Sequence, residues 1–183
     1  AKGSIFKMWR LRFLGKMKTL RKFVKVIFSL VYSHGRVVSI LFGPLSNYKW
    51  VCNKDHQFWM PLGFYEKETT QWLMKSINTG NVFFDIGANV GIYSIYYASI
   101  YGSKVYSFEP SFRNLDLLVR NINLNNLRDN ISVISNPVFD KKILNYFTQT
   151  QNIAGDAGAT FSKKTLFKNN FKTLSITLDY LVK

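Results

Sequence analysis

Two carboxylates and two glycines lie within one short stretch of this sequence, at a spacing that could bind a cofactor. Asp85 follows one apolar run, and Glu109 follows a second apolar run 24 positions later. Gly87 and Gly91 lie between the two acids, in the turn sequence Gly-Ala-Asn-Val-Gly. Carboxylate oxygens accept hydrogen bonds from hydroxyl groups and attract cations, and glycine lets the backbone turn sharply. Together the four residues indicate a site for a ligand with hydroxyl groups and a positive charge.

The elements that must position these residues form a predicted βαβ unit. The apolar runs 82–84 and 104–108 are typical of strands, and residues 92–101 between them are typical of a helix. In an open α/β sheet, ligands bind in the crevice outside the carboxyl ends of the strands. We therefore expect both acids and both glycines to face one site, with each acid at the tip of its strand.

Each residue type suits a task in binding S-adenosylmethionine, which has a ribose diol and a cationic methionine end. Gly87 suits the sharp turn, and Gly91 lies where a side chain would hold a ligand away. Asp85 could order the loop by accepting hydrogen bonds from the backbone amides of the loop, or it could contact the ammonium group of the cofactor. Asn89 tolerates a left-handed backbone. The two oxygens of Glu109 could each accept from a ribose hydroxyl, at about 1.5–3 kcal/mol for each charge-assisted bond.

A dinucleotide site and an ordinary βαβ turn without a ligand remain open at this point. The dinucleotide fingerprint is G-x-G-x-x-G, and here Asn89 stands where its second glycine would be. No Lys-Ser or Lys-Thr pair follows Gly91, so the phosphate-binding loop of nucleoside triphosphatases is excluded. A Rossmann-type NAD or nucleotide-sugar enzyme is therefore the alternative function.

The segment Asp-Ile-Gly-Ala-Asn-Val-Gly at 85–91, with Ser-Phe-Glu-Pro at 107–110, resembles motif I and the acidic loop of the FkbM-family methyltransferases. The resemblance covers about residues 62–183. It includes four further segments: Tyr65-Glu66, Asn114 with Leu118 and 121–125, 136–140, and 177–181. The chain departs from the family at Val138 and Phe139, where the family more often has Ala-Leu.

The resemblance implies an α/β, Rossmann-like class I methyltransferase fold. It also implies an enzyme, an S-adenosylmethionine-dependent O-methyltransferase that acts on a hydroxyl of a sugar, glycan or small metabolite. The cofactor-binding residues would be those of the turn and the acidic loop: Asp85, Gly87, Ala88, Asn89, Gly91 and Glu109. Asn136 and Val138 would flank the adenine, and Glu66 would face the amino-acid end of the cofactor.

No side chain is predicted to remove the proton of the acceptor hydroxyl. By chemistry alone the candidates are Glu66, Asp140, Asp156 and Asp179. The family has a Lys-x-Asp-x-Glu-Gly strand after its Thr-Leu-Asp segment, and this sequence ends at Lys183 before such a strand. We therefore expect the chain to be a fragment of a longer open reading frame, with an incomplete fold.

Length and composition fit one domain with a strongly basic start. The 183 residues carry a formal charge of +15, but residues 1–54 hold 12 basic side chains and no acid, so the remainder is only +3. Apolar residues make up 47% of the chain, enough to fill a core. The single cysteine, Cys52, has no intrachain partner, and His34 and His56 are too few for a zinc site. We expect no metal site and a cytoplasmic location.

Residues 1–45 are predicted to form a basic, amphipathic helical leader. Apolar residues recur there at helical spacing with basic residues between them, a pattern typical of helices on an anionic membrane surface. The longest uncharged run, 26–35, is too short for a bilayer span, which needs about 20 apolar residues. A helix packed on the protein is the simpler alternative, and no recognition motif favours nucleic acid. A non-catalytic, membrane-associated remnant is a further hypothesis.

Two segments follow the leader: an aromatic-rich cap at 46–81, which ends in a predicted helix at 67–77, and the partial Rossmann-like domain at 82–183. In this domain Ser111 is predicted to cap a helix that buries four side chains: Leu115, Leu118, Val119 and Ile122.

Three more strands are predicted towards the end of the chain, at 131–134, 143–148 and 173–178. The last two are expected to form a hairpin across the glycine-rich loop 151–160. This loop is interpreted either as a flap beside the substrate or as a plain surface loop.

Overall fold

The structure is a computed structural model of the 183-residue chain. It describes nine segments: residues 35–53, 60–63, 65–66, 69, 72, 81–150, 155, 158–165 and 168–180. Most of the predicted leader, residues 1–34, lies outside the described residues, as does Asp156. Of the helix predicted at 67–77, Thr69 and Trp72 are described, and both are helical.

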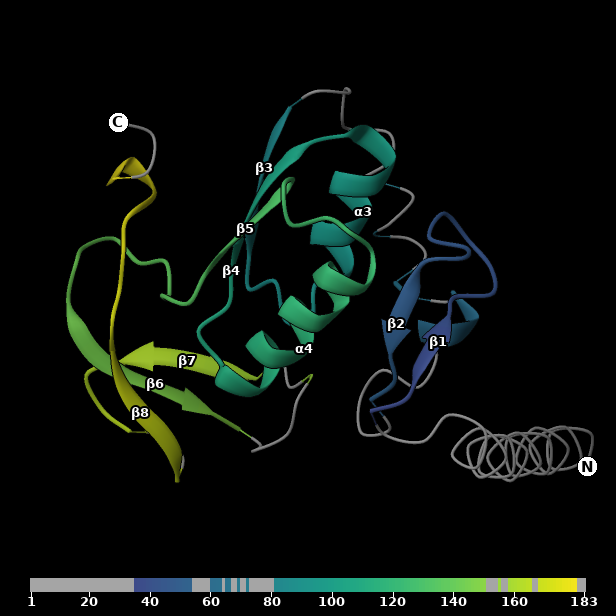
Figure 1. The fold of residues 1–183 in the computed structure, drawn as a ribbon. Helices are drawn as coiled ribbons and strands as arrows, with labels where there is room; N and C mark the ends of the chain where they lie inside the picture. The colour runs from purple at the N-terminus through teal and green to yellow at the C-terminus, as the bar shows by residue number, and fades with distance from the viewer. Residues whose placement is uncertain are drawn as a thin grey trace, which may run out of the picture.

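A parallel sheet with two crossover helices forms the centre of the fold. Along the chain it consists of β3 (Val82–Ile86), α3 (Ile92–Tyr101), β4 (Lys104–Phe108), α4 (Phe112–Leu124) and β5 (Ile131–Ile134). The strand order is β3-β4-β5, and both strand pairs are parallel. Figure 1 shows α3 and α4 on the same side of this sheet. The predicted βαβ unit and the α/β, Rossmann-like class are confirmed.

The two faces of this sheet differ in how they are covered. On the helix side, the ring of Phe83 stacks on Tyr97 of α3 with 3.7 Å between ring centroids, and Val105 is buried. On the other side, Val82 and Ile86 are each 55% exposed. Strands of parallel sheets are usually buried on both faces, so the described part of this chain leaves one apolar face open.

A second, antiparallel sheet follows β5. It contains β6 (Leu144–Gln149), β7 (Ala159–Ser162) and β8 (Asn169–Leu174) in the order β7-β6-β8. The short polar strand β7 was not predicted, and the strand expected at 173–178 ends four residues early. The physical reason lies at the buried Ser175 and its neighbour: the hydroxyl of Ser175 donates to the carbonyl of Lys141 at 2.6 Å, and Ile176 pairs with Val138 in place of β6.

The chain before the parallel sheet contains a small hairpin, β1 (Val37–Ser39) with β2 (Lys49–Val51), followed by the 3-10 turn η1 (Met60–Leu62). Its residues Ile40, Leu45 and Trp50 belong to the same hydrophobic core as α3 and α4. The predicted boundary between a leader at 1–45 and a cap at 46–81 therefore falls inside a folded hairpin.

Helix α4 binds this hairpin through asparagine side chains. Asn121 accepts from the backbone N–H of Val51 at 2.9 Å, and Asn125 accepts from and donates to the backbone of Lys49. The buried face of α4 is thus partly polar, and Val119, predicted to be buried, is 40% exposed. Among the described helices, none is long and apolar enough to cross a membrane.

Candidate functional site

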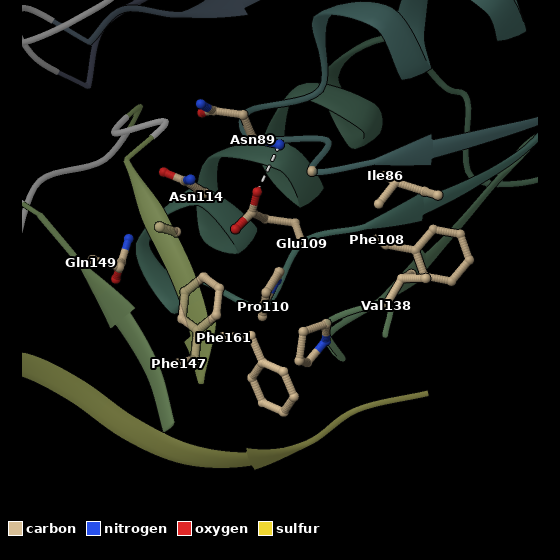
Figure 2. Close-up of a pocket in the computed structure, with 13 residues that line it drawn as sticks. Ile86, Asn89, Phe108, Glu109, Pro110, Asn114, Val138, Phe147, Gln149 and Phe161 are labelled. Atoms are coloured by element: carbon tan, nitrogen blue, oxygen red, sulfur yellow. Dashed lines mark hydrogen bonds between the residues drawn. The ribbon is translucent and has the colours of Figure 1, made fainter. Parts of the chain in front are cut away.

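A cavity of about 310 Å³ lies at the carboxyl ends of the parallel strands. The turn after β3, the residues after β4 and β5, and the first turns of α4 line one side, and the antiparallel sheet closes the other (Figure 2). This is the position that the topology of an open α/β sheet predicts for a ligand crevice.

The turn after β3 is tied to the end of β4 by its own backbone. The N–H groups of Gly87 and Ala88 both donate to the carbonyl of Phe108, at 2.9 and 3.0 Å. The N–H of Gly91 donates to the carbonyl of Ala88 at 2.8 Å. Asn89 adopts the predicted left-handed conformation, with φ 53°. We call the turn closed because the N–H groups of Gly87, Ala88 and Gly91 are all bound by carbonyls of the turn or of the neighbouring strand β4.

The two glycines of the turn have different reasons to be glycine. Gly87 has φ 82° and lines the cavity, and a Cβ there would meet nothing within 4 Å. Gly91 has φ 93°, and a Cβ there would lie 2.4 Å from Cδ1 of Leu118 in α4. Gly91 does not line the cavity. The structure therefore shows a packing reason for this glycine, since it lets α3 and α4 approach, and the predicted close approach to a ligand stays a prediction.

Glu109 follows β4 and lines the cavity, although its side chain as a whole is only 5% exposed. Its Oε2 accepts from the N–H of Asn89 and its Oε1 from the N–H of Ser111, both at 2.8 Å. The side chain of Asn114 also donates to it. Burial raises the pKa of Glu109 from 4.5 to about 7, and these three donors lower it in part.

Asp85 has a different environment, because it is a residue of β3 and not its tip. It is the register partner of Ser107, and the ladder continues through Ile86. Its Oδ2 accepts from the hydroxyl of Ser94 in α3 at 2.5 Å, and Ser94 lies 2.7 Å from the hydroxyl oxygen of Ser107. Burial raises the pKa of Asp85. The expected position at a strand tip is wrong, and Asp85 does not line the cavity.

Glu66 lies beside the first turn of α3. Its carboxylate accepts from the hydroxyl of Tyr93, whose ring meets Tyr65 edge-on at 6.1 Å. Burial, together with the charge and hydrogen bond of Glu66 and the charge of Asp85, raises the pKa of Tyr65 to about 12. The carboxylates of Glu66 and Asp85 therefore both make the electrostatic potential near the start of α3 more negative. Glu66 itself does not line the cavity.

The residues predicted to flank an adenine lie in different places. Val138 lines the cavity and forms an isolated parallel bridge with Ile176. The side-chain amide of Asn136 instead donates to the carbonyl of Leu174 at 2.8 Å, and so joins the end of β5 to β8. Asp140 and Asp179 are exposed and do not line the cavity.

The antiparallel sheet supplies lining residues that the sequence did not predict. Gln149 donates to the hydroxyl of Ser111 at 2.8 Å, so the predicted N-cap of α4 holds β6 and makes no side-chain cap bond to its helix. Gly155 donates to Asn114 at 2.7 Å and accepts from the side chain of Asn89 at 3.2 Å. The sequence of β6 has no apolar alternation that could have located this wall, because Leu144 is exposed while Asn145, Thr148 and Gln149 are buried.

Among the described residues that line the cavity, Glu109 is the only charged one. No lysine, arginine or histidine is among them, and the described segments contain no cluster of three or more His, Cys, Asp or Glu that could hold a metal ion. The cavity therefore suits a ligand that brings hydroxyl groups or positive charge, and not one that brings phosphate.

No family model matches this chain, and no curated protein matches it. Two solved structures from Pyrococcus horikoshii are similar to it in part. One is PH0793, a provisionally assigned transferase, with 21% identity and a TM-score of 0.39 over 48% of this chain and 32% of the other. The second is TYW2 in complex with MeSAdo, with 22% identity and a TM-score of 0.41 over 56% and 37%.

This chain thus spans about a third of the length of either solved structure. The assignment to the FkbM family stays a prediction.

Proposed function

We propose that this chain binds S-adenosylmethionine and forms the cofactor-binding part of an O-methyltransferase for a hydroxyl of a sugar, glycan or small metabolite. The closed turn after β3 carries this proposal. The N–H groups of Gly87, Ala88 and Gly91 donate to backbone carbonyls, and that of Asn89 donates to Glu109. A dinucleotide would need such groups for its pyrophosphate.

The charge of the lining supports the same choice between ligands. A pyrophosphate would meet the carboxylate of Glu109, with no cationic side chain among the described lining residues. S-adenosylmethionine has no phosphate, and its sulfonium and ammonium groups are positive. The lining therefore favours the methyl donor over NAD or a nucleotide sugar.

Glu109 is the residue proposed to hold the ribose. A carboxylate has about four acceptor sites, and three protein donors already bind this one. One hydroxyl of the diol finds a free site, and the second replaces the side-chain amide of Asn114. The two backbone donors, from Asn89 and Ser111, keep the carboxylate in place during this exchange.

Glu66, near the first turn of α3, is proposed to attract the methionine end. Its side chain is exposed there, whereas Asp85 is buried and accepts from the hydroxyl of Ser94. When bound, S-adenosylmethionine supplies a methyl group on sulfur that an oxygen nucleophile can displace. This chain's own contribution would be to bind and orient the donor, because orientation alone can lower a barrier by roughly 7–11 kcal/mol.

Calorimetric titration of the 183-residue chain tests the proposal. We expect heat of binding with S-adenosylmethionine and its demethylated product, S-adenosylhomocysteine, and none with NAD. Glu109→Ala should abolish this heat. Asp116→Ala is the matched control, since it removes an exposed carboxylate of α4 that lies outside the cavity. Binding of NAD alone, or of neither ligand, would refute the proposal.

A further inference from the structure

A row of phenylalanines crosses the antiparallel sheet. Phe147 of β6 is the register partner of Phe161 in β7 and of Phe171 in β8. Register partners project to the same face of a sheet. Two more rings continue the row: Phe139 meets Phe161 edge-on at 5.3 Å, and Phe112 lies 4.7 Å from Phe171.

Only the middle of this row faces the cavity that contains Glu109. Phe147 and Phe161 line it, on the side of the antiparallel sheet (Figure 2). Phe171 and Phe112 line a second hollow, beside the start of α4. Because neighbouring rings support Phe147 and Phe161, the aromatic wall is in place before any ligand arrives.

Apart from Asn89, Glu109 and Asn114 at the proposed ribose site and Gln149 of β6, the described lining residues are apolar. Pro110, Pro137 and Val138 come from the ends of β4 and β5. In a nucleoside the base is bonded directly to the ribose. When Glu109 binds the ribose, the base must therefore lie next to that sugar in the same cavity. The apolar lining of the same cavity is aliphatic in Pro110, Pro137 and Val138 and aromatic in Phe147 and Phe161, which suits a flat, uncharged ring.

We propose that Phe161, supported by Phe147, is the wall against which the adenine ring packs, so that these residues select a purine nucleoside. This inference rests on the proposed function, because it places the base from the ribose site at Glu109. It assigns a ligand-contacting role to a sheet that lies outside the βαβαβ unit.

Calorimetric titration with two probes, S-adenosylhomocysteine and adenosine, tests the wall in the full chain. Replacing an aromatic side chain that stacks on a base by alanine costs about tenfold or more in affinity. We expect Phe161→Ala to weaken both probes by the same factor, since the adenosine moiety is the part they share. Phe161→Tyr keeps the ring and should retain affinity within about threefold, and Phe161→Leu should lie between the two.

Phe112→Ala is the matched control, because Phe112 belongs to the same row, is 65% exposed and does not line the cavity. The affinity of the Phe112→Ala variant for both probes should be unchanged. Thermal melting of each variant separates lost binding from lost folding, and Phe161→Leu carries the test if Phe161→Ala does not fold.

The outcomes separate this inference from the proposed function. If the unmodified chain binds neither S-adenosylhomocysteine nor S-adenosylmethionine, the proposed function fails. If it binds and a folded Phe161→Ala or Phe161→Leu variant binds equally well, the methyl donor stands and the aromatic wall is refuted. Equal losses in Phe112→Ala and Phe161→Ala would also refute it, since the row would then act only by holding the sheet together.

Discussion

Asp85 and Glu109 are two buried carboxylates on neighbouring strands, and they have opposite surroundings. Asp85 binds the hydroxyl of Ser94 on the core side of the sheet, away from the cavity. Glu109 binds backbone N–H groups of Asn89 and Ser111 and lines the cavity. Burial raises the pKa of both. The same chemical group therefore serves the core in one place and the candidate ligand site in the other.

The difference comes from where each acid lies relative to the end of its strand. Asp85 pairs with Ser107 inside the ladder, so its side chain points towards α3, as that of Phe83 does. Glu109 comes directly after Phe108, the last residue paired with β3; its N–H still donates to the carbonyl of Ile134 at 3.0 Å, and its side chain lines the cavity. An acid one residue past a strand end is thus placed for a ligand, and an acid one residue before it is placed for the core.

The largest predicted effect contrasts the two acids directly. Glu109→Ala removes two charge-assisted bonds to a ribose, so we expect the affinity for S-adenosylhomocysteine to fall at least about 100-fold. Asp85→Asn keeps an acceptor for Ser94, and residue 85 is not among those that line the cavity, so we expect a change of no more than a few-fold. Calorimetry on both variants measures this ratio. Equal losses would show that Asp85 contacts the ligand after all.

The sequence predicted the parts of the site whose chemistry depends on residue type and local spacing. The two glycines, the left-handed Asn89 and the acid after β4 all lie where the pattern indicated. It did not predict the environment of Asp85, because composition does not show that the strand continues through Ile86 and so keeps Asp85 in the ladder, next to Ser94 and Ser107. It also did not show the packing reason for Gly91, because the contact is with Leu118, 27 positions away.

The fold was predictable where periodicity is strong and less so where polar contacts override it. The strands and helix of the βαβ unit match their predicted ranges closely. In α4, Asn121 is buried and Val119 exposed because the helix must bind the edge of β2, a partner about 70 residues earlier. Strand β7 has too little apolar pattern to be recognised, and its pairing with β6 defines it.

The next largest effect is the dependence of folding stability on pH. Burial raises the pKa of Glu109 from 4.5 in the unfolded chain to about 7 in the folded protein. Between these two pH values Glu109 is therefore protonated in the folded state and ionised in the unfolded state. The free energy of unfolding should therefore fall as pH rises through this range, by about 3 kcal/mol. Glu109→Gln has no such proton, so its urea denaturation should show a flatter profile from pH 5 to 8. An identical slope in both proteins would contradict the assignment.

The two glycines of the turn allow a second comparison, between Gly91, which packs against the core, and Gly87, which lines the cavity. Gly91→Ala combines a positive φ with a clash against Leu118, so we expect it to destabilise the protein by about 2–3 kcal/mol. Gly87→Ala has the positive φ alone, with open space around the new methyl group, and should cost about 1 kcal/mol. Denaturation midpoints of the two variants measure the difference. A larger loss for Gly87→Ala would mean that Gly87, and not Gly91, is the glycine on which the packing of the turn depends.

The smallest predicted effect concerns ligand affinity and has the opposite sign in pH. If the ribose binds the ionised form of Glu109, whose pKa burial raises to about 7, affinity follows the ionised fraction of this carboxylate. This fraction rises about tenfold between pH 6 and pH 8, and the affinity for S-adenosylhomocysteine should rise by the same factor while folding stability falls. Asp85→Asn should keep this profile, since Asp85 lies outside the cavity. If the profile instead disappears in Asp85→Asn, the proton that controls binding belongs to the core carboxylate, and the division between the two acids is wrong.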